Sequence, residues 1–526
     1  MDSFRRYPAG VQDFEKIRTE GFVYVDKTQY IYDLANTQGD AVFLSRPRRF
    51  GKSLLCSTLK YYFRGRRDLF QGLAIDRLES EWTQYPVLHF DMSRAKNKDV
   101  AKVEANLDYQ LSCFEQQYGS NPVSRNLGDR LQYLIVEAHR QSGHKSVLIF
   151  DEYDSPMLEL ISDRGAMGEV RDLLTEFYGP VKSMGEHLRF VFITGITKFS
   201  QMSIFSSINN LTNISMARRW EGICGITAQE LEQNFVPDIT MLGKCYGLTF
   251  DEMLRELRRL YDGYHFSAGM TDIYNPYSLM KAFALGEVGD YWFDSATPSS
   301  LIETLRHYPF ELGNLDNINV YARAFDQPFD DFDTAIPILY QSGYLTIKDC
   351  TQGRTPIYTL GIPNREVHNG LFETLLSHYV GRNTLNNQSL LMHVAEAMRR
   401  DDIDAAMAAV QSYLAALPYD GNSGRRNELD YERDLRIIFE CIGIEVDTEV
   451  RNATGRCDVV MKTAQRIYVL ELKIDDTATV ADALAQIDEK HYLIPYWNDP
   501  RPAVKVGAVL DRSSRTIREW RVVPSD

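Results

Sequence analysis

The sequence lacks the features that mark membrane, secreted or repetitive proteins. None of its apolar runs reaches the roughly 18 residues that are typical of a membrane-spanning helix. The first ten residues, MDSFRRYPAG, contain no apolar segment of the kind found in secretory signals. Internal repeats and low-complexity tracts are also absent from the sequence. These absences predict a protein with no membrane partner, and a cytoplasmic location follows as the default expectation.

Cysteine and histidine are scarce and scattered. The seven cysteines include no Cys-x-x-Cys pair, and the ten histidines show no spacing typical of metal ligands. An odd number of scattered thiols fits reduced cysteines better than a disulfide framework or a zinc site. The sequence therefore predicts neither a disulfide framework nor a structural zinc site.

Length and charge limit the remaining classes. A chain of 526 residues is too long for a single hydrophobic core, so several domains are expected. The formal net charge is −15, and a chain this acidic does not coat nucleic acid through its overall field. Any contact with DNA or RNA then requires a local basic surface.

Short apolar runs alternate with longer mixed segments in the first ~230 residues. Helical patterns such as KSLLCSTLKYYF and RLQYLIVEAHRQ lie between the runs. This alternation predicts an α/β domain with a mostly parallel sheet and helices on both faces. The predicted buried strands are AVFLSR, PVLHFDMS, SVLIFDEYD and RFVFITGI.

The remainder of the chain divides into three further regions. AIPILYQSGYLTIKD followed by TPIYTLGIP predicts a helix and a short β-hairpin, which is typical of a winged-helix unit. The polar, glycine-containing stretch YDGNSGRRNE is typical of a linker. After it the sequence predicts a helix, three strands, a helix and two strands. The predicted regions are 1–230 (first α/β domain), 231–370 (helical and winged-helix), 371–420 (helical linker) and 421–526 (second α/β domain).

The stretch RPRRFGKS (46–53) ends like a phosphate-binding loop but begins differently. Arg46 stands where the usual pattern has its first glycine, and Pro47 has no N–H to donate. A Gly-Lys-Ser/Thr triplet arises by chance in roughly one in four chains of this length, so the context carries the prediction. The triplet follows a predicted strand and opens a predicted helix, whose start offers unpaired N–H groups to an anion. Lys52 would reach the outer phosphates, and the Ser53 hydroxyl would bind Mg²⁺.

A second motif, VLIFDEYDSP, places two carboxylates at the end of a predicted buried strand. Ligands bind at the carboxyl ends of strands in open α/β sheets. Asp151 would hold Mg²⁺ through water, and Glu152 would orient or deprotonate an attacking water. The alternative is an acidic strand end that only contacts solvent.

A third predicted strand, in RFVFITGITKFS, ends in polar residues. Thr194, Thr197 and Lys198 would either sense the γ-phosphate and its water or form an ordinary exit from the strand. Arg218 and Arg219 also have two alternative roles: they would act as arginine fingers or form a solvated basic turn. The sequence alone does not separate these alternatives.

The C-terminal region contains a separate set of acidic residues and a lysine. Asp458 lies early in one predicted strand, and Glu471 and Lys473 lie near the end of the next, on one face. The two carboxylates would hold a divalent metal, and Lys473 would position a water and stabilise charge on a phosphate. Glu432 on the preceding helix would complete the acidic set, and Gln486 on the following helix would position the site.

The acidic–lysine pattern is weak by itself. Roughly two or more such patterns are expected by chance in a chain of this length, and Asp488-Glu489-Lys490 is another, inside a predicted helix. The order of helix, strand, strand and helix favours Glu471 as the residue of a metal site. The alternative is that the domain is degenerate or purely structural. Six nearby arginines would form either a local basic surface or a solvated helix face and linker: Arg425, Arg426, Arg433, Arg436, Arg451 and Arg456.

In their order along the chain, these motifs resemble those of bacterial AAA-ATPase-like proteins that carry a C-terminal PD-(D/E)XK nuclease-like domain. RPRRFGKS, FDEYDSP, TGITKFS, LYQSGYLTI and GRCDVVMKTAQRIYVLELKI contribute to the resemblance, which covers nearly the whole chain. In that family Arg-Pro-Arg-Arg-Phe-Gly-Lys-Ser/Thr is the usual phosphate loop. The resemblance therefore implies a P-loop ATPase core of the additional-strand type and a restriction-endonuclease-like C-terminal domain.

The resemblance also implies cofactors and partners. ATP and Mg²⁺ are expected at the N-terminal site, Mg²⁺ or Mn²⁺ at the C-terminal site, and DNA or RNA as a partner; a homo-oligomer is left open. Cleavage of nucleic acid under nucleotide control is the expected function, and a nucleotide-controlled switch that binds without cutting is the alternative. The residues expected to contact the nucleotide or its Mg²⁺ are Arg46, Arg48, Arg49, Phe50, Gly51, Lys52, Ser53, Leu54, Asp151 and Thr194.

Overall fold

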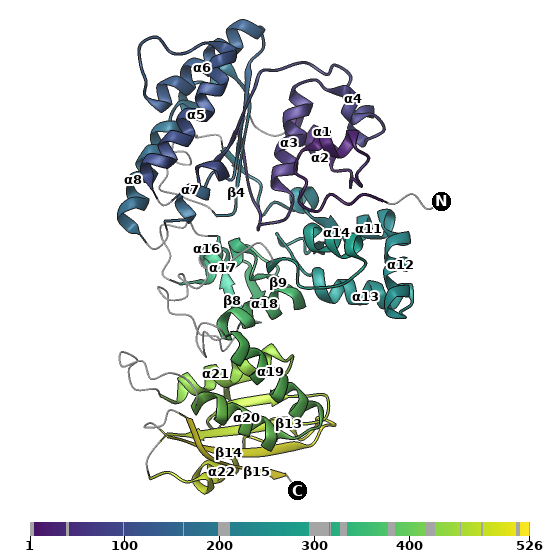
Figure 1. Cartoon of the computed structure of the whole chain (residues 1–526), viewed down its shortest axis with the longest axis vertical. Coiled ribbons are helices and arrows are strands. Elements are labelled where there is room, and N and C mark those ends of the chain that lie inside the picture. Colours follow the sequence, from purple (N-terminus) through teal and green to yellow (C-terminus); the bar gives the residue numbers. More distant parts are fainter. Residues whose placement is uncertain are drawn as a thin grey trace. The chain divides into compact units, whose positions relative to one another are not determined.

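The computed structural model resolves two compact units (Figure 1). The first contains Met1–Phe310 and Asp316–Val367, and the second contains Glu311–Leu315 and His368–Asp526. Among the described residues, no helix is both long enough and apolar enough to cross a bilayer. The described residues are 5–37, 41–97, 99–160, 163–197, 211–293, 315, 317–326, 334–376, 384–415, 427–452, 454–474, 477–511 and 516–524.

The first unit is built on a five-stranded sheet in which every neighbouring pair is parallel. The strand order is β2-β3-β4-β1-β5. Strand β4 thus lies between β1, which leads into RPRRFGKS, and β3, which ends at Asp151. This inserted strand confirms the predicted additional-strand arrangement. The strands are β1 (Ala41–Ser45), β2 (Val87–Asp91), β3 (Ser146–Asp151), β4 (Leu188–Gly195) and β5 (Leu211–Asn213).

Helices cover both faces of this sheet, as the alternating pattern predicts. Figure 1 shows α5, α6 and α8 on one side of the strands and α1 to α3 on the other. The strands read as nearly continuous apolar runs because both of their faces are buried. The helices are α1 (Phe14–Thr19), α2 (Thr28–Thr37), α3 (Lys52–Phe63), α4 (Arg67–Phe70), α5 (Val100–Tyr118), α6 (Leu127–Ser142), α7 (Ser155–Leu158), α8 (Arg164–Tyr178) and α9 (Pro180–Ser183).

The rest of the first unit consists of a helical part and a small antiparallel sheet. Four helices surround the two-stranded pair β6 (Ile226–Thr227) and β7 (Ile273–Tyr274), and capping boxes start two of these helices. Helix α17 precedes the hairpin β9–β10, as predicted, and β8 completes the sheet order β8-β10-β9. The elements are α11 (Ala228–Asn234), α12 (Val236–Tyr246), α13 (Phe250–Tyr261), α14 (Pro276–Leu285), β8 (Ile318–Tyr321), α16 (Ala322–Phe325), α17 (Ile336–Ser342), β9 (Thr346–Cys350) and β10 (Ile357–Gly361).

The second unit contains a mixed sheet in the order β11-β12-β13-β14-β15. Only β13 and β14 pair in parallel, because helix α22 connects them as a crossover. This is the predicted order of helix, three strands, helix and two strands. Helix α18 (Arg365–Leu375) begins in the first unit and continues into the second. The other elements of the second unit are α19 (Thr384–Arg399), α20 (Ile403–Ala415), α21 (Glu428–Cys441), β11 (Glu445–Arg451), β12 (Arg456–Lys462), β13 (Ile467–Lys473), α22 (Val480–Glu489), β14 (Ala503–Asp511) and β15 (Thr516–Pro524).

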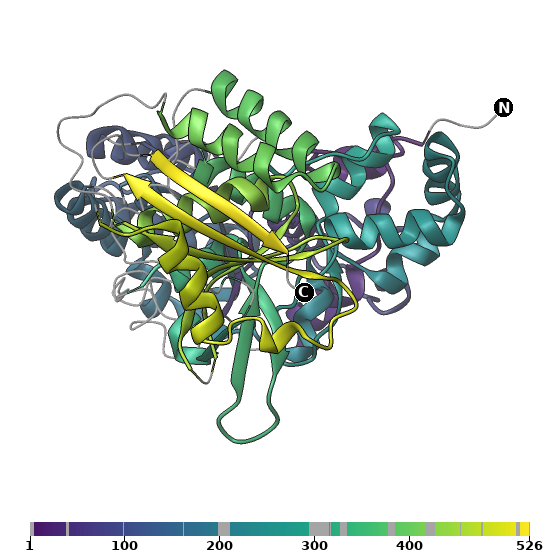
Figure 2. The ribbon, with the colours of Figure 1, turned by 90° about the horizontal axis from the view of Figure 1, so that it is seen from below.

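Helices α19 and α20, expected to form a linker, pack on this mixed sheet. Figure 2 shows these green helices on one side of the yellow strands and α22 on the other. The Gln411 amide donates to the Ile517 carbonyl at 2.7 Å, and the Trp520 indole donates to Asp404 at 3.0 Å. These contacts are made by α20, and both helices belong to the second unit. The finer domain boundaries remain predictions, and residues 416–426 of the expected linker lie outside the described residues.

Candidate nucleotide site and candidate nuclease site

The RPRRFGKS loop opens onto a cleft of about 400 Å³ in the first unit. This volume lies in the range that small-molecule and cofactor sites occupy. The loop from Arg48 to Leu54 forms one wall, together with Glu152. Apolar residues from the N-terminal segment and helix α14 form other walls and offer a surface for a planar base: Pro8, Val11, Val23, Val25, Pro276, Tyr277 and Met280. None of these apolar residues was predicted to belong to the site.

The end of the loop has the conformation that an anion site at a helix start requires. Gly51 has φ of 92°, in the left-handed region that favours glycine, and it caps helix α3. The buried ammonium of Lys52 donates to the carbonyls of Arg46 at 2.9 Å and Pro47 at 3.0 Å. The carbonyls of the loop thus hold the Lys52 ammonium in place. Its positive charge lies beside the N–H groups at the start of α3.

Arg46 lies in the protein interior, which differs from its predicted contact with nucleotide. Only 2% of its surface is exposed, and its guanidinium donates to the carbonyls of Ser45, Ser215 and Trp220 at 2.8 to 3.0 Å. The same group lies 4.2 Å from the ring centre of Phe266. A buried cation requires such acceptors, so this side chain ties β1 to later segments of the first unit.

Replacing Arg46 by lysine is expected to destabilise the first unit by about 2–4 kcal/mol, because an ammonium lacks the planar fork that reaches three carbonyls. Chemical denaturation of the nucleotide-free protein measures this change. The matched variant Arg48→Lys changes a neighbouring loop residue that lines the cleft, and it should cost less than about 0.5 kcal/mol. Equal effects in the two variants would contradict the structural role of Arg46.

The other loop residues divide between the cleft and the core. Phe50 is buried and packs edge-to-face against Tyr264 and Phe266, with ring centres 4.7 and 5.3 Å away. Arg49 also has a positive φ of 69° and lies 4.3 Å from the ring centre of Tyr277. Arg48, Arg49 and Leu54 line the cleft and are therefore available to a bound ligand.

The acidic end of β3 lies beside the RPRRFGKS loop. The Ser53 hydroxyl lies beside the Asp151 carboxylate, which is buried, and burial raises the Asp151 pKa to about 6. Glu152 lines the cleft with a positive φ of 49°. The structure thus brings together Lys52, Ser53, Asp151 and Glu152 from two distant segments. A buried carboxylate next to a hydroxyl is a fitting pair of oxygen ligands for Mg²⁺.

The exit of β4 is held by Asp154, a residue that sequence analysis did not select. Its carboxylate accepts from the backbone N–H groups of Ile196 at 3.0 Å and Thr197 at 2.6 Å, and from the Thr197 hydroxyl at 2.7 Å. The second aspartate of FDEYDSP was the available signal. By joining the ends of β3 and β4, Asp154 fixes the position of the neighbouring Glu152 segment.

Several other predicted residues are engaged within the fold. Thr194 is fully buried, and its hydroxyl donates to the Leu44 carbonyl at 2.8 Å. Arg218 donates to the Ala268 carbonyl at 3.2 Å, and Arg219 pairs with Asp33 at 3.1 Å. Lys198 lies outside the described residues. These contacts explain why the residues are polar without a ligand.

In the second unit, Asp458, Glu471 and Lys473 lie together on two adjacent strands. The Asp458 carboxylate accepts from the Leu472 N–H at 2.6 Å, and the Glu471 carboxylate accepts from the Lys473 ammonium at 2.8 Å. Both carboxylates are buried, and one oxygen of Glu471 has no hydrogen-bond partner. An unpaired buried oxygen of this kind is suited to a hard divalent cation.

The carboxyl groups of this site hold unusually high pKa values. Burial, followed by the charge of Glu471, raises the Asp458 pKa to about 7. Burial, followed by the charge of Asp458, raises the Glu432 pKa to about 8. Crowded carboxylates that resist ionisation indicate a site where a cation would supply the missing positive charge.

Glu428 belongs to the same acidic group and was missed by sequence analysis. Its carboxylate accepts from the Ile474 N–H at 3.2 Å, and its charge raises the pKa values of Asp458 and Glu471. Glu428 and Glu432 lie four residues apart on α21, so they share one face of the helix. That spacing was the available signal.

Gln486 and the nearby arginines surround the acidic group. The Gln486 amide donates to the Tyr492 hydroxyl at 3.4 Å, and that hydroxyl donates to the Arg456 carbonyl at 2.6 Å. Gln486 therefore supports the start of β12 through Tyr492. Arg433 pairs with Asp430 at 3.2 Å, and Arg456 pairs with Glu449, so part of the predicted basic surface is neutralised. Arg425 and Arg426 lie outside the described residues.

Comparisons with known proteins match both ends of the chain to described families. Residues 8–205 match a family model described as "Predicted AAA-ATPase", and residues 427–520 match the PD-(D/E)XK nuclease superfamily. The chain is also 32% identical over 531 residues to a protein from Azotobacter chroococcum mcd 1, with 98% of each chain covered. That relative carries the name "Uncharacterized protein in vnfD 5'region". The first match contains RPRRFGKS and FDEYDSP, and the second contains Asp458, Glu471 and Lys473.

Proposed function

The chain belongs to the AAA-ATPase-like family with a C-terminal PD-(D/E)XK nuclease domain, and we propose that it hydrolyses ATP and cleaves nucleic acid under nucleotide control. The single observation that carries this proposal is the pairing of two chemically complete sites in one chain. Lys52, Ser53 and the two carboxylates form the first site, and the buried carboxylates with Lys473 form the second. Each set has the residue types that its reaction requires.

In the first unit, the chain's own residues would bind ATP by its two ends. The N–H groups at the start of α3 and the Lys52 ammonium would hold the phosphates, while Tyr277 and Met280 would contact the base. Ser53 and Asp151 would hold Mg²⁺, which when bound would neutralise charge on the phosphates. Glu152 at the edge of the cleft would orient the attacking water.

In the second unit, Asp458 and Glu471 would hold the divalent metal, with Glu428 and Glu432 as further acidic neighbours. The metal, when bound, would lower the pKa of a water and polarise the scissile phosphate. Lys473 lies 2.8 Å from Glu471 and would stabilise charge that develops on the phosphate. The complete acidic and lysine set favours cleavage over binding without cutting.

The purified full chain should cleave one class in a panel of single- and double-stranded DNA and RNA when Mg²⁺ or Mn²⁺ is present. Omission of ATP should change the cleavage rate at least about tenfold if nucleotide state controls the nuclease, as a coupling of about 1.4 kcal/mol requires. Gel analysis of labelled substrates measures both effects.

Three outcomes of this panel would count against parts of the proposal. Absence of cleavage with every substrate and metal would contradict the nuclease function. Metal-independent retention of a substrate without cleavage would instead support a nucleotide-controlled binding switch. Cleavage at the same rate with and without ATP would contradict nucleotide control alone.

A further inference from the structure

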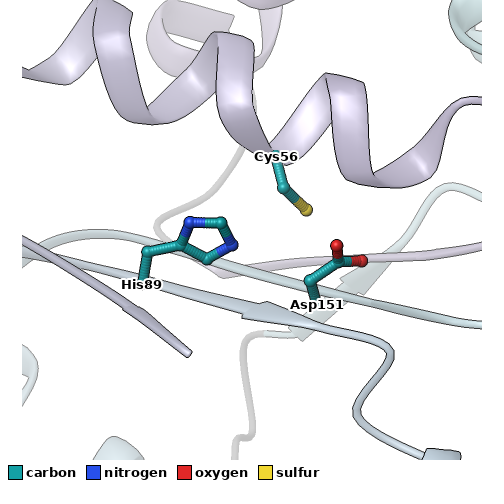
Figure 3. A group of neighbouring side chains, drawn as sticks. All are labelled: Cys56, His89 and Asp151. Carbon is teal, nitrogen blue, oxygen red and sulfur yellow. The ribbon is translucent and has the colours of Figure 1, made fainter. Parts of the chain in front are cut away.

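Three side chains of different chemistry converge beside the phosphate loop. Cys56 comes from α3, His89 from β2 and Asp151 from β3, and they point toward one another (Figure 3). One candidate ligand atom from each lies within 4.8 Å of the others. In the part of the chain that the structure describes, this is the one group of three or more His, Cys, Asp and Glu residues that meets this limit.

Two of the three side chains have a buried polar atom without a hydrogen-bond partner. The Nε2 atom of His89 is buried and has no hydrogen-bond partner, and neither has the Oδ1 atom of Asp151. Buried polar atoms are nearly always paired, so two orphaned atoms in one cluster require an explanation. The Ser53 hydroxyl and the Cys56 thiol lie beside the Asp151 carboxylate. Neither contact satisfies His89.

The donor set is wrong for Mg²⁺ and right for a softer cation. Mg²⁺ selects oxygen ligands, whereas Zn²⁺ accepts cysteine sulfur, histidine nitrogen and aspartate oxygen together. Three protein ligands with a fourth position for water is a common arrangement at zinc. Ligand atoms around one tetrahedral Zn²⁺ lie about 3–4 Å apart, so small side-chain movements would close this cluster on an ion.

We propose that a zinc-class divalent cation binds at Cys56, His89 and Asp151 in the nucleotide-free protein. The cation would displace the proton of the Cys56 thiol, accept the lone pair of His89 and occupy the unpaired oxygen of Asp151. The sequence predicts no zinc site, because the three residues share no local spacing. The site arises only where α3 crosses the neighbouring strands β2 and β3.

The protonation states of the free side chains suit this assignment. Burial lowers the His89 pKa to about 4, so its imidazole is neutral near pH 7 and can serve as a ligand. Burial raises the pKa of the Cys56 thiol well above its ordinary value, so a cation must release its proton on binding.

Cobalt(II) provides the direct test, since a cobalt–thiolate bond gives a charge-transfer absorption that oxygen and nitrogen ligands do not. Titration of the full chain with CoCl₂ should produce this band with one equivalent per chain, and Zn²⁺ should displace it. The band should disappear in Cys56→Ser, a nearly isosteric change. In His89→Gln the cobalt affinity should fall at least about tenfold, as for loss of one ligand.

A matched control removes other thiols. The exposed cysteines Cys113 and Cys245 are replaced by serine together, and the band should remain unchanged. Absence of the band in the wild type, its persistence in Cys56→Ser, or its loss in the double control would each overturn the proposal. Circular dichroism of Cys56→Ser and His89→Gln verifies that a lost band does not reflect a lost fold.

Occupation of this site should also weaken ATP binding, a consequence that rests on the proposed role of Asp151 at Mg²⁺. With Zn²⁺ present, the ATP affinity of the wild type should fall at least about tenfold, while that of Cys56→Ser should not change. An equal fall in both proteins would contradict competition for Asp151. If the wild type bound no ATP under any condition, the proposed function would fail, and the cobalt band would still decide the cation site.

Discussion

Replacing Lys52 by alanine is expected to abolish ATP binding, with a loss of affinity of at least about 100-fold. The ammonium is buried against the carbonyls of Arg46 and Pro47 at the start of α3, where it would face the outer phosphates. Hydrogen bonds to charged groups contribute about 1.5–3 kcal/mol each, and two phosphate contacts account for the expected loss. Fluorescence titration with a labelled ATP analogue measures the affinity.

A second lysine on the same helix provides a control for the loss of positive charge in Lys52→Ala. Lys60 lies two turns further along α3, beside Asp13, and does not belong to the predicted site. Lys60→Ala should bind ATP within about twofold of the wild type, since Lys60 does not line the cleft and its partly exposed pair with Asp13 contributes under about 1 kcal/mol. Unchanged affinity in Lys52→Ala would refute the phosphate-loop assignment, and the nuclease assignment would be unaffected.

Replacing Asp458 or Lys473 by alanine should reduce metal-dependent cleavage by at least about 100- to 1,000-fold. Asp458 is a buried candidate ligand, and Lys473 is the only residue of the set that brings positive charge. Removal of one group that stabilises charge in a transition state costs about 3–4 kcal/mol. Initial cleavage rates on the preferred substrate of the panel, at saturating Mn²⁺, measure the effect.

The chain supplies its own decoy for this experiment. Asp488-Glu489-Lys490 has the same acidic–lysine pattern, but it lies at the end of α22, where Lys490 is exposed. Lys490→Ala should leave cleavage within about twofold of the wild type. Binding of the same substrate should survive in Lys473→Ala, because one lysine supplies only a single phosphate contact. Full cleavage by Lys473→Ala would show that another residue stabilises the phosphate.

Secondary structure was predicted correctly where apolar residues recur with a regular period along the chain. The apolar strands of the first unit, the helix after Gly51 and the helix-then-hairpin at α17 to β10 all have such patterns. The acidic–lysine set was likewise predictable, because Glu471 and Lys473 lie two residues apart on one strand and the strand order is local. Periodicity along the chain carries this information.

The burial of Arg46 could not be read from its neighbours. The basic stretch RPRRFGKS suggests solvent or phosphate, yet its first arginine binds carbonyls of residues 169 and 174 positions further along the chain. The side chain is buried because later segments provide carbonyl acceptors for its guanidinium. No pattern in the neighbouring sequence indicates these acceptors. Glu428 was missed for a milder reason, since its role depends on which face of α21 meets β12.

The sequence by itself determined most of the secondary structure and the alternation behind the parallel sheet, because those follow from short-range periodicity, whereas the additional-strand core was implied by the resemblance to a known family. Only the tertiary structure decided which further polar groups join these predicted sites and which leave them, since Glu428 lies with the acidic group and Arg46 lies in the interior. Cys56, His89 and Asp151 are scattered residues in the sequence and one cluster in the fold. Contacts between distant segments form when buried faces pack together, and the chemistry that results depends on three-dimensional proximity rather than on spacing along the chain.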